Sequence, residues 1–186
     1  MKNLAGIRTE LRKYKSFRQN LRDGNWSAAN QFITSCPVAL SAIIANTGST
    51  ALHIAFLAGH LQIVKELVNM LPTDKLLEIK DKDGNTFLGY CALFGNKKMA
   101  KCIVKKCPSL PGIGNGPNAL VPVVMAVRPS SNSIAMARYL LRQTDLKILS
   151  PGKGRNGATF VTRCFYSKAF GKNLFFFFLE DDKKFN

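Results

Sequence analysis

The chain has 186 residues, a length that can bury a substantial core. Its 27 lysines and arginines outnumber its 11 aspartates and glutamates and give a net charge of +16, which would attract acidic partners. Its five cysteines are an odd number and form no Cys-x-x-Cys pair, which excludes a disulfide-rich scaffold and a zinc-binding cysteine motif.

Residues 1–13 form a basic N-terminal extension. The segment has charged side chains and no apolar run, which excludes a secretory signal: Lys2, Arg8, Glu10, Arg12 and Lys13. Together with the unpaired cysteines, this segment makes the cytoplasm the expected location.

A first helical unit is expected over residues 14–46. Residues 24–33 repeat the pattern of residues 59–68 at an offset of 35, in which a glycine precedes a helix with one apolar face. The first unit is therefore an atypical copy of the second.

The second unit, residues 47–82, contains the clearest motif of the chain. Thr50 can cap a short inner helix that Leu52 and Ala55 fill, and Gly59 stands where that helix must stop. A second, outer helix follows, because apolar residues recur there at spacings of three and four: Leu61, Ile63, Val64, Leu67, Val68 and Leu71.

The third unit, residues 83–114, repeats the second at an offset of 36. Gly84, Thr86 and Gly95 take the places of Gly48, Thr50 and Gly59. The dipeptide Asp83-Gly84 predicts a tight turn, so that residues 80–83 form a projecting finger. The outer helix has a predicted buried face of four residues: Met99, Ala100, Ile103 and Val104.

A fourth unit is expected over residues 115–145. Residues 116–120 repeat residues 84–88 at an offset of 32, whereas the apolar residues near the end of the unit recur at an offset of 37. The difference of five residues indicates an insertion, which the polar Pro/Ser-rich stretch 128–133 is expected to hold.

The tail, residues 146–186, is expected to be a degenerate repeat that begins near residues 157–162 and then becomes irregular. The apolar run 173–179 is much shorter than the roughly 20 residues that cross a bilayer. Since uridine-rich RNA encodes runs of phenylalanine such as residues 175–178, we hypothesise that the tail reads through a splice boundary and is truncated.

The period and the motif resemble the ankyrin repeat, whose signature T-P-L-H-x-A is matched by residues 50–55 with Ala51 in place of proline. The resemblance implies an all-α solenoid of about four helix–turn–helix units. It also implies structural roles for the residues that carry the motif: Thr50, Leu52, His53, Ala55, Gly59, His60, Gly84, Thr86 and Gly95. The imidazole of His53 is expected to hydrogen-bond the backbone between units.

Five segments together resemble the plant ankyrin-repeat membrane proteins, namely residues 23–26, 50–53, 81–86, 96–100 and 107–111. In that family a cytosolic ankyrin array precedes a PGG domain with transmembrane helices, and members act in stress and defence signalling. The resemblance implies a position at the cytosolic face of the plasma membrane, although this chain has no PGG motif and no apolar stretch long enough to span a bilayer.

The sequence predicts no catalytic residue, cofactor or metal, and hence no enzyme. The glycine-rich stretches 112–116 and 151–157 lack the strand and the spacing of nucleotide-binding loops, so the first is interpreted as a linker. Cys91 aligns with Ala55 and is interpreted as a small buried residue.

Charge is distributed unevenly along the chain. Residues 84–144 contain no acidic residue and many basic ones, including Lys97, Lys98 and Lys101 at the start of an outer helix. These lysines either keep the array in solution or attract an anionic membrane or acidic protein; nucleic acid is the least favoured partner, because no base-reading motif accompanies the charge.

The favoured function is therefore a non-enzymatic scaffold that binds a protein partner on its concave side. The alternative is a basic module that binds a membrane surface or, less favoured, nucleic acid. The candidate partner contacts lie on the finger and the inner helices: Phe56, Lys80, Asp81, Lys82, Asp83, Asn85 and Tyr90.

Overall fold

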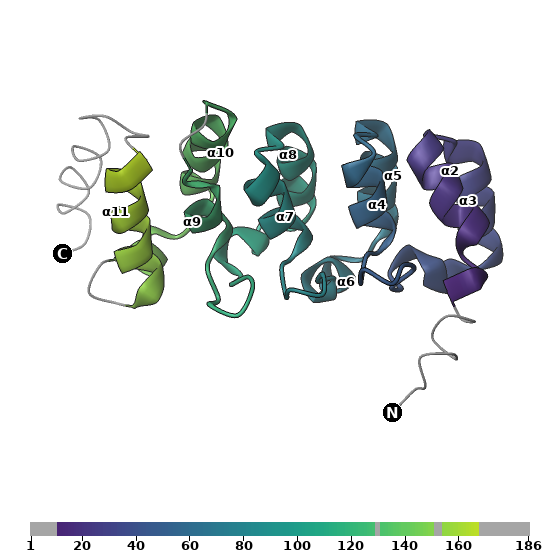
Figure 1. Cartoon of the computed structure of the whole chain (residues 1–186), viewed down its shortest axis with the longest axis horizontal. Helices are drawn as coiled ribbons and strands as arrows, with labels where there is room; N and C mark the ends of the chain where they lie inside the picture. Colours follow the sequence, from purple (N-terminus) through teal and green to yellow (C-terminus); the bar gives the residue numbers. More distant parts are fainter. Residues whose placement is uncertain (1–10, 129–130, 151–153, 168–186) are drawn as a thin grey trace.

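The computed structural model describes residues 11–128, 131–150 and 154–167, and in them the helices form a single elongated stack (Figure 1). Antiparallel helix pairs follow one another: α2 (Lys15–Asp23) with α3 (Trp26–Ser35), α4 (Ala51–Leu57) with α5 (Leu61–Met70), α7 (Phe87–Phe94) with α8 (Lys97–Lys106), and α9 (Pro122–Ala126) with α10 (Ser131–Leu141). The helix α11 (Arg155–Ser167) packs on α9 and continues the stack. The predicted all-α ankyrin solenoid is confirmed.

Helix starts and stops follow the predicted signals. The Thr86 hydroxyl accepts a hydrogen bond from the Gly89 amide at 3.1 Å, and the Asn96 side chain caps α8 in the same way. Gly59 and Gly95 have φ of +79° and +68°, a conformation that costs least at glycine. These local signals set the helix bounds that divide the chain into units.

The core runs through the whole stack because each unit buries the faces that the sequence predicts. In α5 and α8 the predicted apolar faces are buried, Leu61 excepted, which is partly exposed. Large side chains are fully buried in every unit, so the units share one continuous core: Phe17, Leu21, Ile44, Leu52, Leu67, Leu71, Leu76, Phe87, Leu88, Met99, Ile103, Leu140 of the fourth unit and Phe160.

A short helix, α6 (Thr73–Glu78), lies between α5 and the finger and was not predicted. It begins after Pro72 and buries one residue, Leu76, completely. Six residues with one apolar anchor are too few to show helical periodicity, so the sequence pattern could not reveal this element. Further three-residue to four-residue 3-10 turns, η1 (Pro37–Leu40), η2 (Leu110–Gly112) and η3 (Leu146–Leu149), occupy other connections.

The predicted position of the insertion in the fourth unit is correct for only a minor part of the extra residues. Gly84 precedes the first residue of α7 by three positions, whereas Gly116, which has a similar positive φ, precedes Pro122 of α9 by six. Much of the extra length therefore lies in the finger, and α10 already begins at Ser131, inside the stretch expected to be a loop. The helix N-caps Thr86 and Val121 are consequently separated by 35 residues.

The stack continues beyond residue 145, where the repeat frame was expected to degenerate. In α11, Phe160 is fully buried, and the guanidinium of Arg163 donates to the Val124 carbonyl at 2.8 Å. The helix thus has the position of an inner helix of a fifth unit. The phenylalanine run 175–178 and the proposed splice boundary lie outside the described residues.

Candidate functional site

Five aromatic rings pack edge to face where α4 meets α7. Phe56 touches Phe87, Tyr90 and Phe94 with ring centroids 5.8, 5.4 and 5.7 Å apart, and His53 lies 5.2 Å from Tyr90. Such contacts add stability beyond the buried area. They hold the outermost rings in fixed positions.

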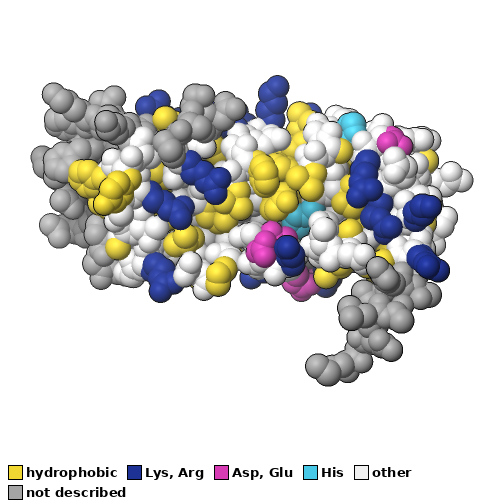
Figure 2. Space-filling model, viewed as in Figure 1, with side chains coloured by type: hydrophobic (Ala, Val, Ile, Leu, Met, Phe, Trp, Pro, Cys, Tyr) yellow, Lys and Arg dark blue, Asp and Glu magenta, His cyan; other side chains and the backbone are white. Residues whose placement is uncertain are grey.

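Part of this cluster is exposed. Phe94 is 59% exposed and Tyr90 partly exposed, while Phe56 is only 6% exposed and supports them from below. We call these three residues the aromatic surface. Figure 2 shows hydrophobic side chains gathered over the middle of the stack, with acidic side chains at their lower edge and basic ones on both sides.

His53 has a structural role, but within its own unit and not between units as expected. Its Nδ1 accepts from the Thr50 amide at 3.3 Å and pairs with the Thr50 hydroxyl at 3.0 Å, while its buried Nε2 has no hydrogen-bond partner. Burial lowers the pKa of His53, and the charge of Asp81 opposes that shift only in part. The imidazole is therefore neutral at pH 7, with Nδ1 as the acceptor.

The finger is built by Asp81. One carboxylate oxygen accepts from the amides of Asp83 and Asn85 at 2.9 and 2.8 Å, and the other accepts from the Asn85 side chain at 2.9 Å. Asn85 is 8% exposed, so this predicted partner contact instead shapes the turn. Lys80, Lys82 and Asp83 are exposed.

The finger adjoins the aromatic surface, and Figure 2 shows acidic side chains at the lower edge of the hydrophobic group. Burial raises the pKa of Tyr90, and the negative charges of Asp81 and Asp83 raise it further. Two carboxylates thus lie close enough to the phenol to affect its ionisation. A partner that covers Tyr90 would also meet the finger.

A buried asparagine that the sequence analysis missed joins the third unit to the fourth. The amide oxygen of Asn115 accepts from the Thr86 amide and hydroxyl at 2.7 and 2.8 Å, and its nitrogen donates to the carbonyls of Ile113 and Leu120. A Cβ at Gly89 would collide with Asn115. The sequence analysis interpreted the stretch 112–116 as a linker. In the structure this stretch also bonds the third unit to the fourth through Asn115.

The same arrangement recurs one unit later. The side chain of Asn156 accepts from the Val121 amide at 2.9 Å and donates to the Ala119 carbonyl at 3.3 Å. A sequence signal could have located the start of this inner helix: residues 121–126 match the T-P-L-H-x-A signature at Pro122 and Ala126. The longer finger places this match three residues later than the repeat spacing predicts.

His60 has its expected structural place. Its Nε2 pairs with the Arg22 carbonyl at 2.8 Å, and its ring lies so close to Gly24 that a Cβ there would meet it at 2.8 Å. The outer face of the stack carries the lysines of α8. Lys97 places its ammonium 5.9 Å from the Tyr139 ring centroid, and Lys98 and Lys101 are exposed.

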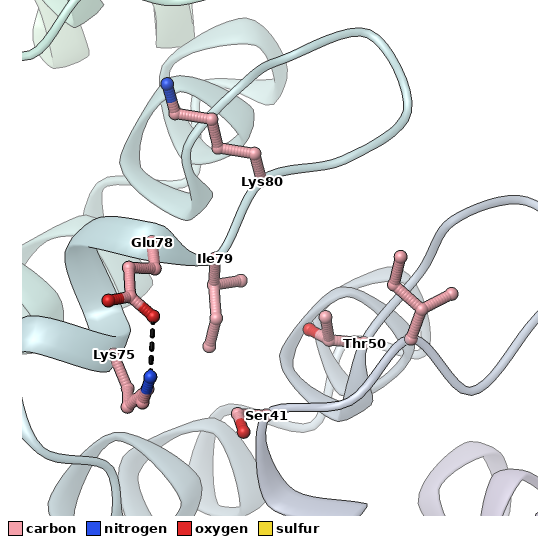
Figure 3. A pocket seen from close by; sticks show the side chains of 7 residues that line it. Ser41, Thr50, Lys75, Glu78, Ile79 and Lys80 are labelled. Atoms are coloured by element: carbon pink, nitrogen blue, oxygen red, sulfur yellow. Dashed lines mark hydrogen bonds and ion pairs between the residues drawn. The ribbon is translucent and has the colours of Figure 1, made fainter.

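A cavity of about 230 Å³ lies beside the finger, between α6 and the loop after η1 (Figure 3). Lys75 and Glu78 form an ion pair of 2.7 Å at its rim, and Ser41, Thr50 and Lys80 are also among the residues that line it. Exposed pairs of this kind contribute little energy. The Thr50 hydroxyl of this lining is the one that pairs with the buried His53.

Cys91 and the metal-ligating side chains are the other groups with possible reactive chemistry. Burial raises the pKa of the Cys91 thiol, which agrees with a small buried residue. Residues 11–128, 131–150 and 154–167 hold no cluster of three metal-ligating side chains. No helix among these residues is both long and apolar enough to cross a bilayer.

Residues 21–111 match the family model of ankyrin repeats, in three copies. These residues are ankyrin repeats. The match extends from the end of α2 through α8 and thus includes the finger and the aromatic surface. Ankyrin repeats are generally modules for protein–protein interaction and typically non-enzymatic scaffolds. A search of curated proteins found no match to the chain.

Proposed function

We propose that this protein is a scaffold that binds a protein partner on the aromatic surface and the adjoining finger. The observation that carries this proposal is the exposure of Phe94 and Tyr90 on a rigid aromatic base between two repeats. Tyrosine anchors with buried support are typical of the centres of protein interfaces. A groove of inner helices and fingers is the surface that repeat arrays use for binding.

Exposure divides the candidate contacts into two groups. Lys80, Lys82, Asp83 and Tyr90 have accessible side chains and are the proposed direct contacts. Phe56, Asp81 and Asn85 are the proposed supports, because their side chains hold the aromatic surface and the finger in shape.

The resemblance of the motifs to plant ankyrin-repeat membrane proteins supports a finer proposal, that the partner acts in stress or defence signalling. Identification of captured partners by mass spectrometry from stressed and unstressed plant tissue tests it. Enrichment of no signalling protein in either sample would count against this finer proposal and leave the scaffold proposal standing.

The experiment for the scaffold proposal compares two variants as baits in partner capture. Replacing Lys82 and Tyr90 with alanine should reduce captured partner at least about tenfold, since loss of a central aromatic anchor costs 2 kcal/mol or more. Because Tyr90 also packs on Phe56 and Phe94, the thermal midpoint of the variant is measured, and capture is compared at a temperature at which both baits are folded. Capture that survives this change would refute the proposal.

A second candidate function, binding to an anionic surface, is favoured by the acid-free stretch 84–144. The matched variant replaces Lys97, Lys98 and Lys101 with glutamine. If the scaffold proposal holds, this change flattens the salt dependence of capture without abolishing it. Loss of capture at physiological salt in this variant alone would favour the basic surface instead.

A further inference from the structure

Arg128 borders the aromatic surface on the side of the fourth unit, and a second arginine, Arg163, follows on α11 of the fifth unit. The guanidinium of Arg128, which follows α9, donates to the carbonyl of Leu93 at 3.4 Å. Leu93 immediately precedes the exposed Phe94 in α7. The backbone bond thus anchors an exposed cation next to the aromatic surface. Figure 2 shows basic side chains on the α9–α11 side of the hydrophobic group.

The second arginine, Arg163, reaches the same region from α11. It is partly buried, and one nitrogen donates to the Val124 carbonyl of α9 at 2.8 Å. Burial lowers the pKa of Arg163, and the positive charge of Arg128 lowers it further, so the two cations are near enough to repel each other. Like charges placed together are unfavourable unless an anion joins them.

No carboxylate of the described residues pairs with either arginine. Residues 84–144 contain no aspartate or glutamate, and the next acidic residue, Asp145, uses its side chain to accept from the Lys147 amide. Each guanidinium has five N–H donors, and one of its nitrogens donates to a backbone carbonyl. The remaining donors form forks that match the two oxygens of a carboxylate.

We propose that Arg128 and Arg163 bind a carboxylate of the partner, so that the aromatic surface and this pair together select a segment with an apolar side chain beside aspartate or glutamate. This inference rests on the proposed function and names the chemistry of its partner. Apolar anchoring by Tyr90 and Phe94 supplies contact area, and the arginine pair supplies the preference for acidic segments.

The probe is a fluorescent ten-residue peptide in which Trp-Leu is flanked on each side by two glutamates, with a second peptide that has glutamines in their place. Anisotropy is measured with the full chain at physiological salt. We expect the glutamate peptide to bind about tenfold more tightly, which corresponds to about 1.4 kcal/mol. Changing both Arg128→Gln and Arg163→Gln should remove most of that difference.

Two further variants separate this site from general charge and from misfolding. Lys105→Gln with Arg142→Gln removes the same charge from exposed positions, one on α8 and one in the turn after α10, and should keep the difference. Arg163→Lys keeps the charge but loses the planar guanidinium, so it should lose part of the difference in affinity between the two peptides. The thermal midpoint of this variant is measured to show that it is folded.

Equal binding of the two peptides, binding of neither, or an equal loss in the Lys105/Arg142 variant would overturn the proposal. Tyr90→Ala separates this result from failure of the scaffold function, because it should weaken both peptides alike. If Tyr90→Ala lowers capture of the partner but the arginine changes alter no peptide affinity, the scaffold proposal stands and the carboxylate site is wrong.

Discussion

The second and third repeats differ in the hydrogen bond made by the backbone amide of the threonine that precedes the inner helix. At the start of α4, the Thr50 amide donates to His53 of its own unit, whereas at the start of α7 the Thr86 amide donates to Asn115 of the following unit. Gly89 stands where the second repeat has His53, and its missing side chain leaves the space that Asn115 fills. A group that cannot remain unpaired in the core has thus been paired locally in one unit and across the interface in the next.

This difference affects how the units depend on each other. The Thr50–His53 pair lies within one helix turn, so it persists if the neighbouring unit opens. The Thr86–Asn115 bonds, in contrast, break when the fourth unit separates from the third. Coupling between repeats should accordingly be stronger on the C-terminal side of α7, where Asn156 repeats the arrangement.

The largest expected effect should be equal in the two units, because their apolar packing is alike. Leu52 and Leu88 are fully buried at equivalent positions. Replacing either with alanine should cost about 2–5 kcal/mol of unfolding free energy, measured by urea denaturation. The exposed Lys65→Ala serves as control, and a loss no larger than in this control would show that the leucines do not fill the core.

Replacement of Asn115 with alanine should distinguish the units. It leaves two buried polar groups of Thr86 without their partner, at a cost of about 1–3 kcal/mol each. Amide hydrogen exchange should accelerate in α9 and α10 more than in α4 and α5. The exposed Asn69→Ala is the matched control, and uniform acceleration along the stack would contradict interface coupling.

A smaller effect, confined to acid pH, should distinguish the second unit. His53 is neutral in the folded chain and has a lowered pKa, whereas the unfolded state takes up a proton below about 6.5. The contribution of neutral His53 to the free energy of unfolding is therefore complete above pH 6.5. It is lost as the pH falls toward the pKa of His53 in the folded chain. His53→Gln should flatten this decline in thermal midpoint, and an unchanged slope would show that another group is responsible.

The smallest expected effect comes from restoring threonine at the start of α9. Val121 is buried and provides no side-chain cap. Val121→Thr should stabilise the chain by about 0.5 kcal/mol, because a capping bond worth about 1 kcal/mol is offset in part by burial of the hydroxyl. Destabilisation in chemical denaturation would show that the asparagine bond alone satisfies this helix end.

The sequence could predict elements whose signals are local. Thr86 and Gly95 mark the ends of α7, and the spacing of Met99 to Val104 predicts the buried face of α8, because caps and periodicity act within about one helix turn. The aromatic surface was predicted in part, through Phe56 and Tyr90. Its exposed third member, Phe94, was not among the candidates.

Contacts between units were not predictable in the same way. Asn115, Arg128 and Arg163 bond to groups 29, 35 and 39 positions away. Such separations vary with the length of the finger. Three extra residues before α9 shifted the fourth unit relative to the alignment of residues 116–120 with residues 84–88. Only the three-dimensional arrangement brings Arg128 beside Phe94 and Arg163 onto α9.

The most direct test of the proposed binding surface is site-specific photo-crosslinking with benzoylphenylalanine at position 90 or at position 101 of the full chain. Tyr90 belongs to the aromatic surface, whereas Lys101 is exposed on the outer helix α8. The account predicts a partner adduct from position 90 and none above background from position 101. An adduct from position 101 alone, or equal adducts from both positions, would contradict it.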